Sequence, residues 1–250
     1  MRKILIGNWK MQLSVRESVA LARALRAGVK KAKTTIVLCP SFPAIPAVRD
    51  ALRGGAFALG AQDLFWETKG QYTGEVSGAA LRELGCSFVI VGHSERRAHL
   101  GETDEMVNKK VSAALAARLT PILCVGETRE ERERGTRDAA LRRQVHVALR
   151  GLTPAQIGKV IVAYEPVWVI GSGKAVPPKD AVRAHGKIRN AVEEVAGAAV
   201  KVRVIYGGSV DSNNGAGFLR EAAVDGCLVG GASLRAAEFL KLVQVAETVA

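Results

Sequence analysis

Residues 160–176 read VIVAYEPVWVIGSGKAV, and this stretch decides how the rest of the chain is interpreted. The apolar, mostly β-branched residues at 160–163 are typical of a buried strand, and Pro166 has no backbone N–H with which to continue a strand ladder. Glu165 is therefore expected at the end of a strand. The connection that follows is rich in large apolar residues and has two glycines around Ser172. Such a connection is either a lid over a ligand or a buried loop that plugs the end of a sheet.

Segments with the same β-branched, apolar character recur along the whole chain. The expected strands are residues 3–7, 34–39, 56–61, 87–92, 120–125, 159–165, 201–206 and 223–229. Helical patterns lie between them. Ser14 with Glu17 forms a capping-box pattern, and Thr103 and Thr136 are placed to open helices. These last two helices are expected at 104–118 and 137–150, and helix ends are expected at Gly28, Gly85 and Gly197.

Nearly continuous apolar strands that alternate with helices indicate parallel strands buried on both faces. The economical arrangement is an α/β fold in which residues 1–250 form a single domain, a closed eightfold β/α barrel. The alternative is an open doubly wound sheet, but no G-x-G-x-x-G turn follows an early strand. In a barrel, the polar residues just after the strands gather at one end, so the strand ends should carry compatible chemistry.

The amino-acid composition limits the classes of protein to which this chain can belong. A hydrophobic content of 48% over 250 residues predicts an ordered chain with a large core, and no stretch approaches the roughly 18 apolar residues of a membrane span. The four cysteines, which are widely spaced, suggest neither a metal site nor a disulfide framework. The apolar run after Arg2 and Lys3 is too short for a signal peptide. We therefore expect a cytoplasmic protein without a metal site or a membrane partner.

The formal charge of +12 raises the alternative of a nucleic-acid or polyanion partner. The distribution of the charged residues argues against a nucleic-acid partner. Glu130 and Arg134 are four residues apart, as are Glu133 and Arg137, which predicts one solvated helix face with internal ion pairs. No aromatic residues alternate with the basic ones to offer stacking surfaces for bases.

Three chemically distinct side chains fall at expected strand ends. Lys10 follows the first strand, His93 the fourth and Glu165 the sixth. Taken alone, Lys10 could be an ordinary surface lysine and His93 a structural histidine. Their shared register at one end of a barrel favours a catalytic site with a base and positive or hydrogen-bonding groups.

Glycine pairs follow the seventh and eighth expected strands, in YGGSV at 206–210 and LVGGASL at 228–234. Glycines let backbone amides approach a ligand, and a helix that starts at such a pair directs its positive end at a phosphate. The alternative is a pair of tight turns. Two other motifs are incomplete. The stretch 171–174 lacks the Ser or Thr of a P-loop, and 92–94 lacks the second glycine of a serine elbow.

Six blocks along the chain together resemble the triosephosphate isomerase family. They are GNWKM at 7–11, VGHSERR at 91–97, CVGET at 124–128, AYEPVW at 163–168, YGGSV at 206–210 and LVGGASL at 228–234. The resemblance spans the chain in the family's order. It implies a TIM barrel and a homodimeric glycolytic enzyme that interconverts dihydroxyacetone phosphate and D-glyceraldehyde 3-phosphate without a cofactor.

The resemblance also implies a role for individual residues. Glu165 is the expected base, and His93 the electrophile, with Lys10 supplying positive charge and Asn8 a hydrogen bond. Residues 166–176 become a closing lid that excludes water. The backbone amides expected at the phosphate are those of Gly171, Ser209, Gly230 and Gly231. Supporting residues are Ser94, which is expected to hold Glu165, Glu95, which is expected to pair with Lys10, and Cys124. Thr73, in the loop 70–77, is expected to reach a partner subunit.

The chain departs from the family's usual pattern at Gln12, Val169, Ser172 and Ala175. These positions bear on lid kinetics and leave the reaction type unchanged. Two other functions compete with the isomerase. One is a phosphate-binding barrel with aldolase or lyase chemistry through a Schiff-base lysine, and the other is an inactive basic barrel that binds polyanions. A tetramer is an alternative to the dimer.

Overall fold

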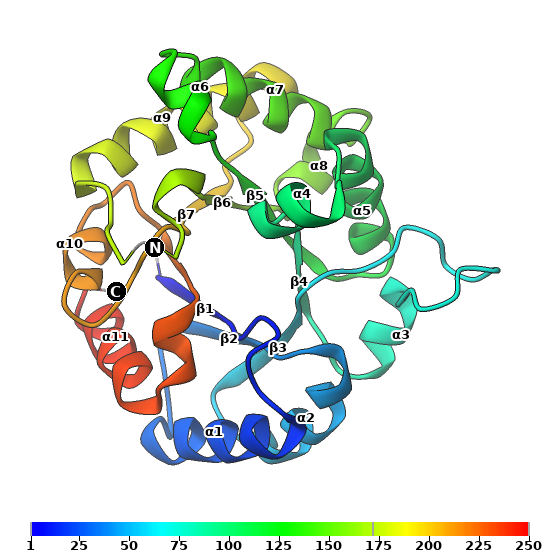
Figure 1. Cartoon of the computed structure of the whole chain (residues 1–250), viewed down its shortest axis with the longest axis vertical. Coiled ribbons are helices and arrows are strands. Elements are labelled where there is room, and N and C mark those ends of the chain that lie inside the picture. Colours follow the sequence, from blue (N-terminus) through cyan, green and yellow to red (C-terminus); the bar gives the residue numbers. More distant parts are fainter. Residues whose placement is uncertain (1, 172, 250) are drawn as a thin grey trace.

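In the computed structural model, which describes residues 2–171 and 173–249, a closed barrel of eight parallel strands is ringed by helices (Figure 1). The strands follow in sequence order around the barrel, and β1 pairs with both β2 and β8. Their bounds are β1 Ile4–Asn8, β2 Thr35–Cys39, β3 Phe57–Ala61, β4 Phe88–Val91, β5 Thr120–Val125, β6 Ile161–Tyr164, β7 Arg203–Tyr206 and β8 Gly226–Val229. The prediction of a closed barrel is confirmed, and each expected strand overlaps an observed one.

The helices occupy the connections between the strands. They are α1 Val15–Gly28, α2 Ile45–Leu52, α3 Gly78–Glu83, α4 Ser94–Leu100, α5 Asp104–Ala116, α6 Arg129–Glu133, α7 Arg137–Leu149, α8 Pro154–Ile157, α9 Pro178–Ala196, α10 Gly215–Leu219 and α11 Ala236–Thr248. Short 3-10 turns are η1 Phe42–Ala44, η2 Val167–Val169 and η3 Gly231–Leu234. In the part of the chain that the structure describes, no helix combines the length and the apolar character that crossing a membrane requires.

Apolar side chains form two separate layers, because successive residues of a strand point to opposite faces. One layer fills the inside of the barrel and includes Ile6, Ile90, Ile122 and Leu228. The larger layer lies between the strands and the surrounding helices. Both faces of every strand are therefore buried, which is the physical reason for the continuous apolar runs in the sequence.

Most predicted helix signals are present, with two corrections. Ser14 forms the expected capping box with Glu17, and Thr103 accepts from the N–H of Met106 at the start of α5. Thr136 precedes α7 but makes no side-chain cap, because its hydroxyl donates to the carbonyl of Glu131 at 3.0 Å.

The second correction concerns the reason for the glycine at the end of α1. Gly85 and Gly197 have φ values of 91° and 84°, as expected for glycines that follow a helix. Gly28 ends α1 for a different reason. A Cβ on Gly28 would lie 2.5 Å from Leu240, so glycine is needed there for close packing of α1 against α11.

The charged segment after β5 is two helices rather than one. Arg134 pairs with Glu130 at 2.6 Å, as predicted. The predicted pair of Glu133 with Arg137 is wrong, because Gly135, with φ of 69°, ends α6 and separates the two residues. Arg137 instead pairs with the neighbouring Asp138.

The segment between β3 and α3 projects away from the barrel (Figure 1). Its base is closed by the N–H of Phe65, which donates to the carbonyl of Val76 at 2.8 Å. Thr73 is exposed in this segment, and Tyr72 packs against Phe65 with ring centroids 4.8 Å apart. The expected projecting loop is therefore present, and the packing of these two aromatic side chains supports it.

Candidate active site

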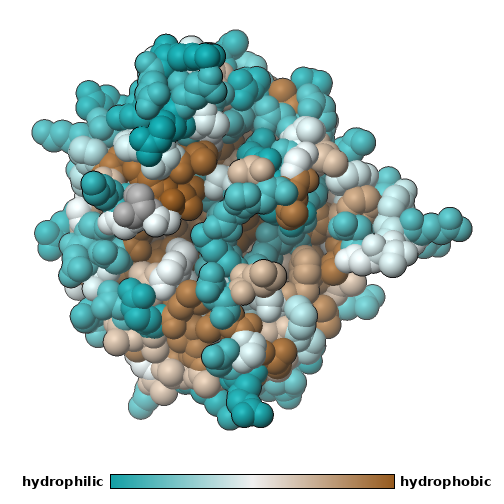
Figure 2. All heavy atoms as spheres, viewed as in Figure 1, coloured by the Kyte–Doolittle hydropathy of each residue, from teal (hydrophilic) through white to brown (hydrophobic). Residues whose placement is uncertain are grey.

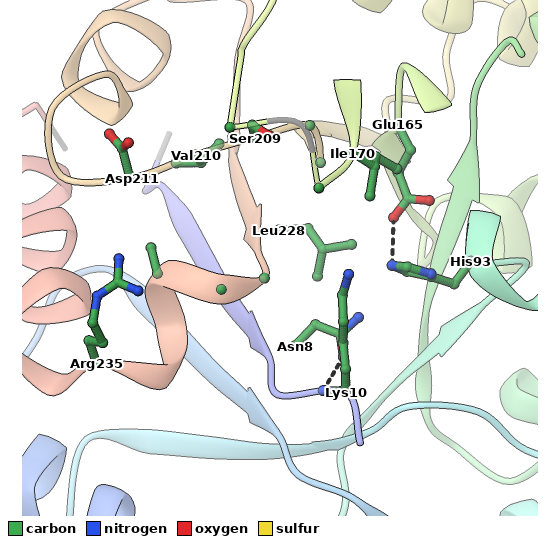
Figure 3. Close-up of a pocket in the computed structure, with 17 residues that line it drawn as sticks. Asn8, Lys10, His93, Glu165, Ile170, Ser209, Val210, Asp211, Leu228 and Arg235 are labelled. Carbon is green, nitrogen blue, oxygen red and sulfur yellow. Dashed lines mark hydrogen bonds and ion pairs between the residues drawn. The ribbon is translucent and has the colours of Figure 1, made fainter. Parts of the chain in front are cut away.

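A cavity of about 250 Å³ lies at the carboxyl ends of the strands (Figure 3). In the same orientation as Figure 1, Figure 2 shows a hollowed face on which brown hydrophobic residues are set among teal polar ones. Eight of the residues expected at the site line the cavity: Asn8, Lys10, His93, Glu165, Gly171, Ser209, Gly230 and Gly231. Among the described residues, no three His, Cys, Asp or Glu side chains are grouped so as to hold a metal.

Glu165 is almost completely buried directly after β6. Its backbone N–H donates to the carbonyl of Val125 at 2.8 Å, which fixes the residue beside the end of β5. The carboxylate accepts from the N–H of Ser94 at 3.0 Å through Oε2. Its other oxygen, Oε1, lies 3.2 Å from Nε2 of His93 (Figure 3). The backbone amide of Ser94, and not its hydroxyl, is therefore the group that holds Glu165.

His93 stands at the N-cap of α4. Its Nδ1 accepts from the backbone N–H of Glu95 at 3.2 Å. A neutral imidazole whose Nδ1 accepts a hydrogen bond carries its proton on Nε2. The N–H of the ring is thus presented to the side of the cavity on which Glu165 lies.

Lys10 has a left-handed backbone conformation, with φ of 52°. Its N–H donates to Oδ1 of Asn8 at 3.1 Å, and its carbonyl accepts from Nε2 of Gln62 at 2.8 Å. These two bonds stabilise the unusual turn after β1. The Lys10 ammonium extends into the cavity and pairs with Glu95, as the family resemblance implies.

The glycine pairs lie along one side of the cavity, but neither begins an α-helix as the sequence suggested. Gly231 opens the four-residue turn η3, and α11 starts only after Arg235. After β7, the carboxylate of Asp211 accepts the N–H groups of the next residues and forms a turn that delays α10 until Gly215. Backbone amides remain the groups available to a phosphate here.

The segment 166–176, which is the expected lid, is bonded to residues at and after the end of β7 at two points. The hydroxyl of Ser209 donates to the carbonyl of Val169 at 2.9 Å, and the N–H of Val176 donates to the Tyr206 hydroxyl at 3.3 Å. Ile170 and Gly171 face the cavity. Ser172, one of the expected departures from the family pattern, lies outside the described residues.

The start of the expected lid contacts two charged residues, of which only Arg132 lies in the run that the sequence predicted to be solvated. Glu127, which is fully buried, accepts from the Trp168 indole N–H at 2.9 Å and from the Tyr164 hydroxyl at 3.1 Å. The Arg132 guanidinium lies 4.3 Å above the Trp168 ring. Burial, and then the Glu127 carboxylate, raise the pKa of Tyr164, so its hydroxyl remains a donor.

The end of β5 is braced next to Glu165. Gln144 clamps Gly126 with two hydrogen bonds, from its amide to the Gly126 carbonyl at 3.0 Å and from the Gly126 N–H to its oxygen at 2.8 Å. Cys124 is buried inside the barrel, and burial followed by the charge of Glu165 raises the pKa of its thiol. The expected supporting position of Cys124 is therefore next to the base.

Three buried charged residues and the partly exposed Arg96 form a cluster near His93 that the sequence did not reveal. The Lys110 ammonium lies 2.7 and 2.8 Å from the two oxygens of Asp63 and 2.7 Å from Glu102. Arg96 contacts both acids, at 2.9 and 2.7 Å. Glu102 also accepts the N–H of Gly92, the residue before His93, at 3.0 Å. Burial raises the pKa of Asp63 to about 6, against the opposing effect of Lys110.

Comparison with known proteins gives one consistent result. The family model described as triosephosphate isomerase matches residues 3–246. The triosephosphate isomerases of Endomicrobium trichonymphae and Moorella thermoacetica are 47% and 49% identical to the chain, over 98% and 97% of its length and 99% and 98% of theirs. The crystal structure of triosephosphate isomerase from Bartonella henselae has a TM-score of 0.88 and 37% identity, and the match covers 98% of this chain and 99% of that one. The chain belongs to the triosephosphate isomerase family.

Proposed function

We propose that this chain interconverts dihydroxyacetone phosphate and D-glyceraldehyde 3-phosphate, with Glu165 as the base and His93 as the electrophile. Membership of the family supports the reaction. The observation that carries the assignment of residues is the 3.2 Å contact between Glu165 and His93 inside a cavity that also contains Lys10. The reaction needs one group that moves a proton between adjacent carbons and another that stabilises the oxygens, and these two side chains supply them.

Glu165 takes a proton from C1 of the ketose and returns it to C2. The carboxylate first leaves the Ser94 amide, which lies 3.0 Å from it. Its backbone stays fixed by the bond to Val125, so the movement is a rotation of the side chain. The Cys124 thiol, whose pKa burial raises, stays neutral beside the base and adds no competing charge.

His93 donates its Nε2 proton toward the substrate carbonyl oxygen, on which negative charge develops in the enediolate. The Glu95 N–H on Nδ1 fixes the tautomer needed for this donation. Lys10 adds a positive charge to the same region, and its bond to Glu95 orients it. Asn8 sets the turn that brings Lys10 into the cavity.

The phosphate of the substrate binds to the backbone amides of Gly171, Ser209, Gly230 and Gly231. All four residues line the same cavity as Glu165 and His93. The lid contributes Ile170 and Gly171, so closure brings an apolar cover and an amide together. Exclusion of water protects the enediolate from loss of phosphate.

The test is a coupled assay of triose phosphate interconversion with wild type and Glu165→Gln. Glutamine has the same shape and is not a base, so we expect turnover to fall by roughly 10²–10⁴-fold. The matched control is Glu105→Gln, an exposed position in α5, which should leave turnover unchanged. Full activity in Glu165→Gln would remove this residue from the mechanism.

We also propose that the chain works as a homodimer in which Thr73 reaches the partner's active site. Met11 follows the catalytic Lys10 and is 93% exposed, which is unusual for a large apolar side chain and suits a surface that a second subunit covers. The projecting segment around Thr73 would be the covering element. Sedimentation of wild type and Met11→Asp tests this, because a buried charge should shift the equilibrium to monomer, whereas an unchanged dimer would argue against it. A tetramer is the other assembly that this measurement distinguishes.

We place the enzyme in the cytoplasm on the basis of its cysteines. Cys39, Cys86, Cys124 and Cys227 are free and buried. Such thiols suit a reducing compartment. Fractionation of the source cells with a specific antibody tests this location.

A further inference from the structure

Two opposite charges lie at the phosphate end of the cavity, outside the set of residues predicted from the sequence. Arg235 follows η3, and Asp211 follows β7. Both line the cavity. Figure 3 shows them on the same side, away from Glu165 and His93, with the Arg235 side chain directed toward the loop that carries Asp211.

The two cations that line the cavity differ in what surrounds them. Lys10 is paired with Glu95. Arg235 is exposed and, among the described residues, has no ion-pair partner, although its charge contributes to the lowered pKa of Glu238, mainly the effect of a hydrogen bond from Ser212. A guanidinium that is not neutralised at a cavity mouth attracts anions from solution.

Asp211 has a structural reason to be at this position. One carboxylate oxygen accepts the N–H groups of Asn213 at 2.8 Å and Asn214 at 3.0 Å. The residue therefore shapes the loop after β7, which also carries Ser209. Asp211 nevertheless lines the cavity in which we propose that a phosphate dianion binds, and like charges repel.

We propose that Arg235 is a specificity-determining residue that recruits the phosphate dianion and offsets the repulsion from Asp211. This inference rests on the proposed function, since it concerns the phosphate of the same substrate. The amides of Gly230 and Gly231 are neutral donors that recognise phosphate oxygens at short range. Arg235 acts earlier and at longer range because it carries a full charge on a flexible arm at the mouth.

The expected kinetic signature follows from this position. A cation that attracts substrate and transition state equally changes kcat/KM and leaves kcat almost unchanged. Through water, one charge acting on a dianion several ångströms away corresponds to roughly 3- to 10-fold in kcat/KM. Salt screens this interaction, so the loss should be largest at low ionic strength.

The experiment compares Arg235→Gln with Arg220→Gln, which makes the same change of charge at the exposed end of α10. We expect Arg235→Gln to lose roughly 3- to 10-fold in kcat/KM with kcat within about 2-fold, and Arg220→Gln to match wild type. Asp211→Asn keeps an oxygen for the turn and should raise kcat/KM. Equal losses in both arginine variants, or no loss in Arg235→Gln, would overturn the proposal.

A binding measurement separates this proposal from the proposed function. Inorganic phosphate is titrated calorimetrically into Glu165→Gln and into the same variant with Arg235→Gln. We expect the Kd to rise roughly 3- to 10-fold with the second substitution. Unchanged phosphate affinity would refute the role of Arg235 whether or not the wild type isomerises, whereas absent isomerisation with weakened phosphate binding would refute the reaction and retain Arg235.

Discussion

Replacement of Lys110 by methionine tests how the buried charges behind His93 are balanced. Methionine keeps much of the length of lysine and removes its charge. The change leaves the carboxylates of Asp63 and Glu102 without the ammonium that lies 2.7–2.8 Å from three of their oxygens. Arg96 stays in contact with both acids and provides partial compensation.

The expected size of the effect follows from burial. Asp63, Glu102 and Lys110 are 5%, 7% and 3% exposed, so solvent cannot replace the lost partner. Removal of one member of a buried pair costs about 3–5 kcal/mol because it leaves an uncompensated charge. We expect the lower half of this range, since Arg96 remains and Asp63 can take up a proton.

The way in which the stability deficit of Lys110→Met changes with pH follows from the pKa of Asp63. Burial raises the pKa of Asp63 to about 6 even with Lys110 present, and the loss of Lys110 raises it further. An acid with a raised pKa in the folded state destabilises the fold when it is ionised. The deficit of Lys110→Met should therefore be full above about pH 7 and should shrink as the pH falls toward 5.

Urea unfolding at pH 5 and pH 8 measures this, with Lys109→Met as the matched control. Lys109 is exposed and lies 5.2 Å from the Trp66 ring, so its loss should cost at most about 1 kcal/mol at either pH. Equal destabilisation in the two variants, or a deficit for Lys110→Met that grows as the pH falls, would refute the electrostatic explanation of the cluster.

Two further predictions concern buried groups. His185 is fully buried with Nδ1 3.2 Å from the Ala223 carbonyl, and burial lowers its pKa to about 4, so stability should fall by about 3 kcal/mol from pH 6.5 to 4. His185→Gln should lose less over that range in thermal unfolding, and parallel curves would contradict this. Gly126→Ala would place a Cβ 1.6 Å from the Glu165 carbonyl oxygen, so we expect a loss above about 3 kcal/mol or failure to fold. The control, Gly186→Ala, meets no atom within 4 Å and should stabilise α9 by up to about 1 kcal/mol, so similar unfolding midpoints would count against the clash.

The strands and the catalytic end of the barrel were predictable because they depend on local pattern and topology. A strand covered on both faces has to be apolar throughout, and parallel strands bring all of their carboxyl ends to one side. Lys10, His93 and Glu165 could therefore be placed at one mouth from their positions after strands. Their contacts could not, since the 3.2 Å approach of His93 to Glu165 depends on side-chain conformations.

The remaining parts of the site depend on contacts between residues far apart in the chain. Asp63 and Lys110 are separated by 47 positions, and nothing in the spacing of either indicates the other. Arg132 belongs to an alternating acidic and basic run that is typical of a solvated helix, yet it lies against Trp168. The local sequence shows the alternating charges of this run, but the fold determines which of its charged residues contacts Trp168.

The placement of Glu165 explains why a glycine directly follows each of the two strands that neighbour β6. A Cβ at Gly126, after β5, would meet the Glu165 carbonyl, and one at Gly207, after β7, would lie 3.0 Å from Cγ of Glu165. Glu165 therefore lies between two glycines, one on each side, which have no side chains to occupy the space around it. Its peptide is fixed by Val125, and its side chain keeps the space to rotate away from the Ser94 amide. Glu165 can thus move its carboxylate while its backbone stays still, which is what the proposed proton transfer between two adjacent carbons requires.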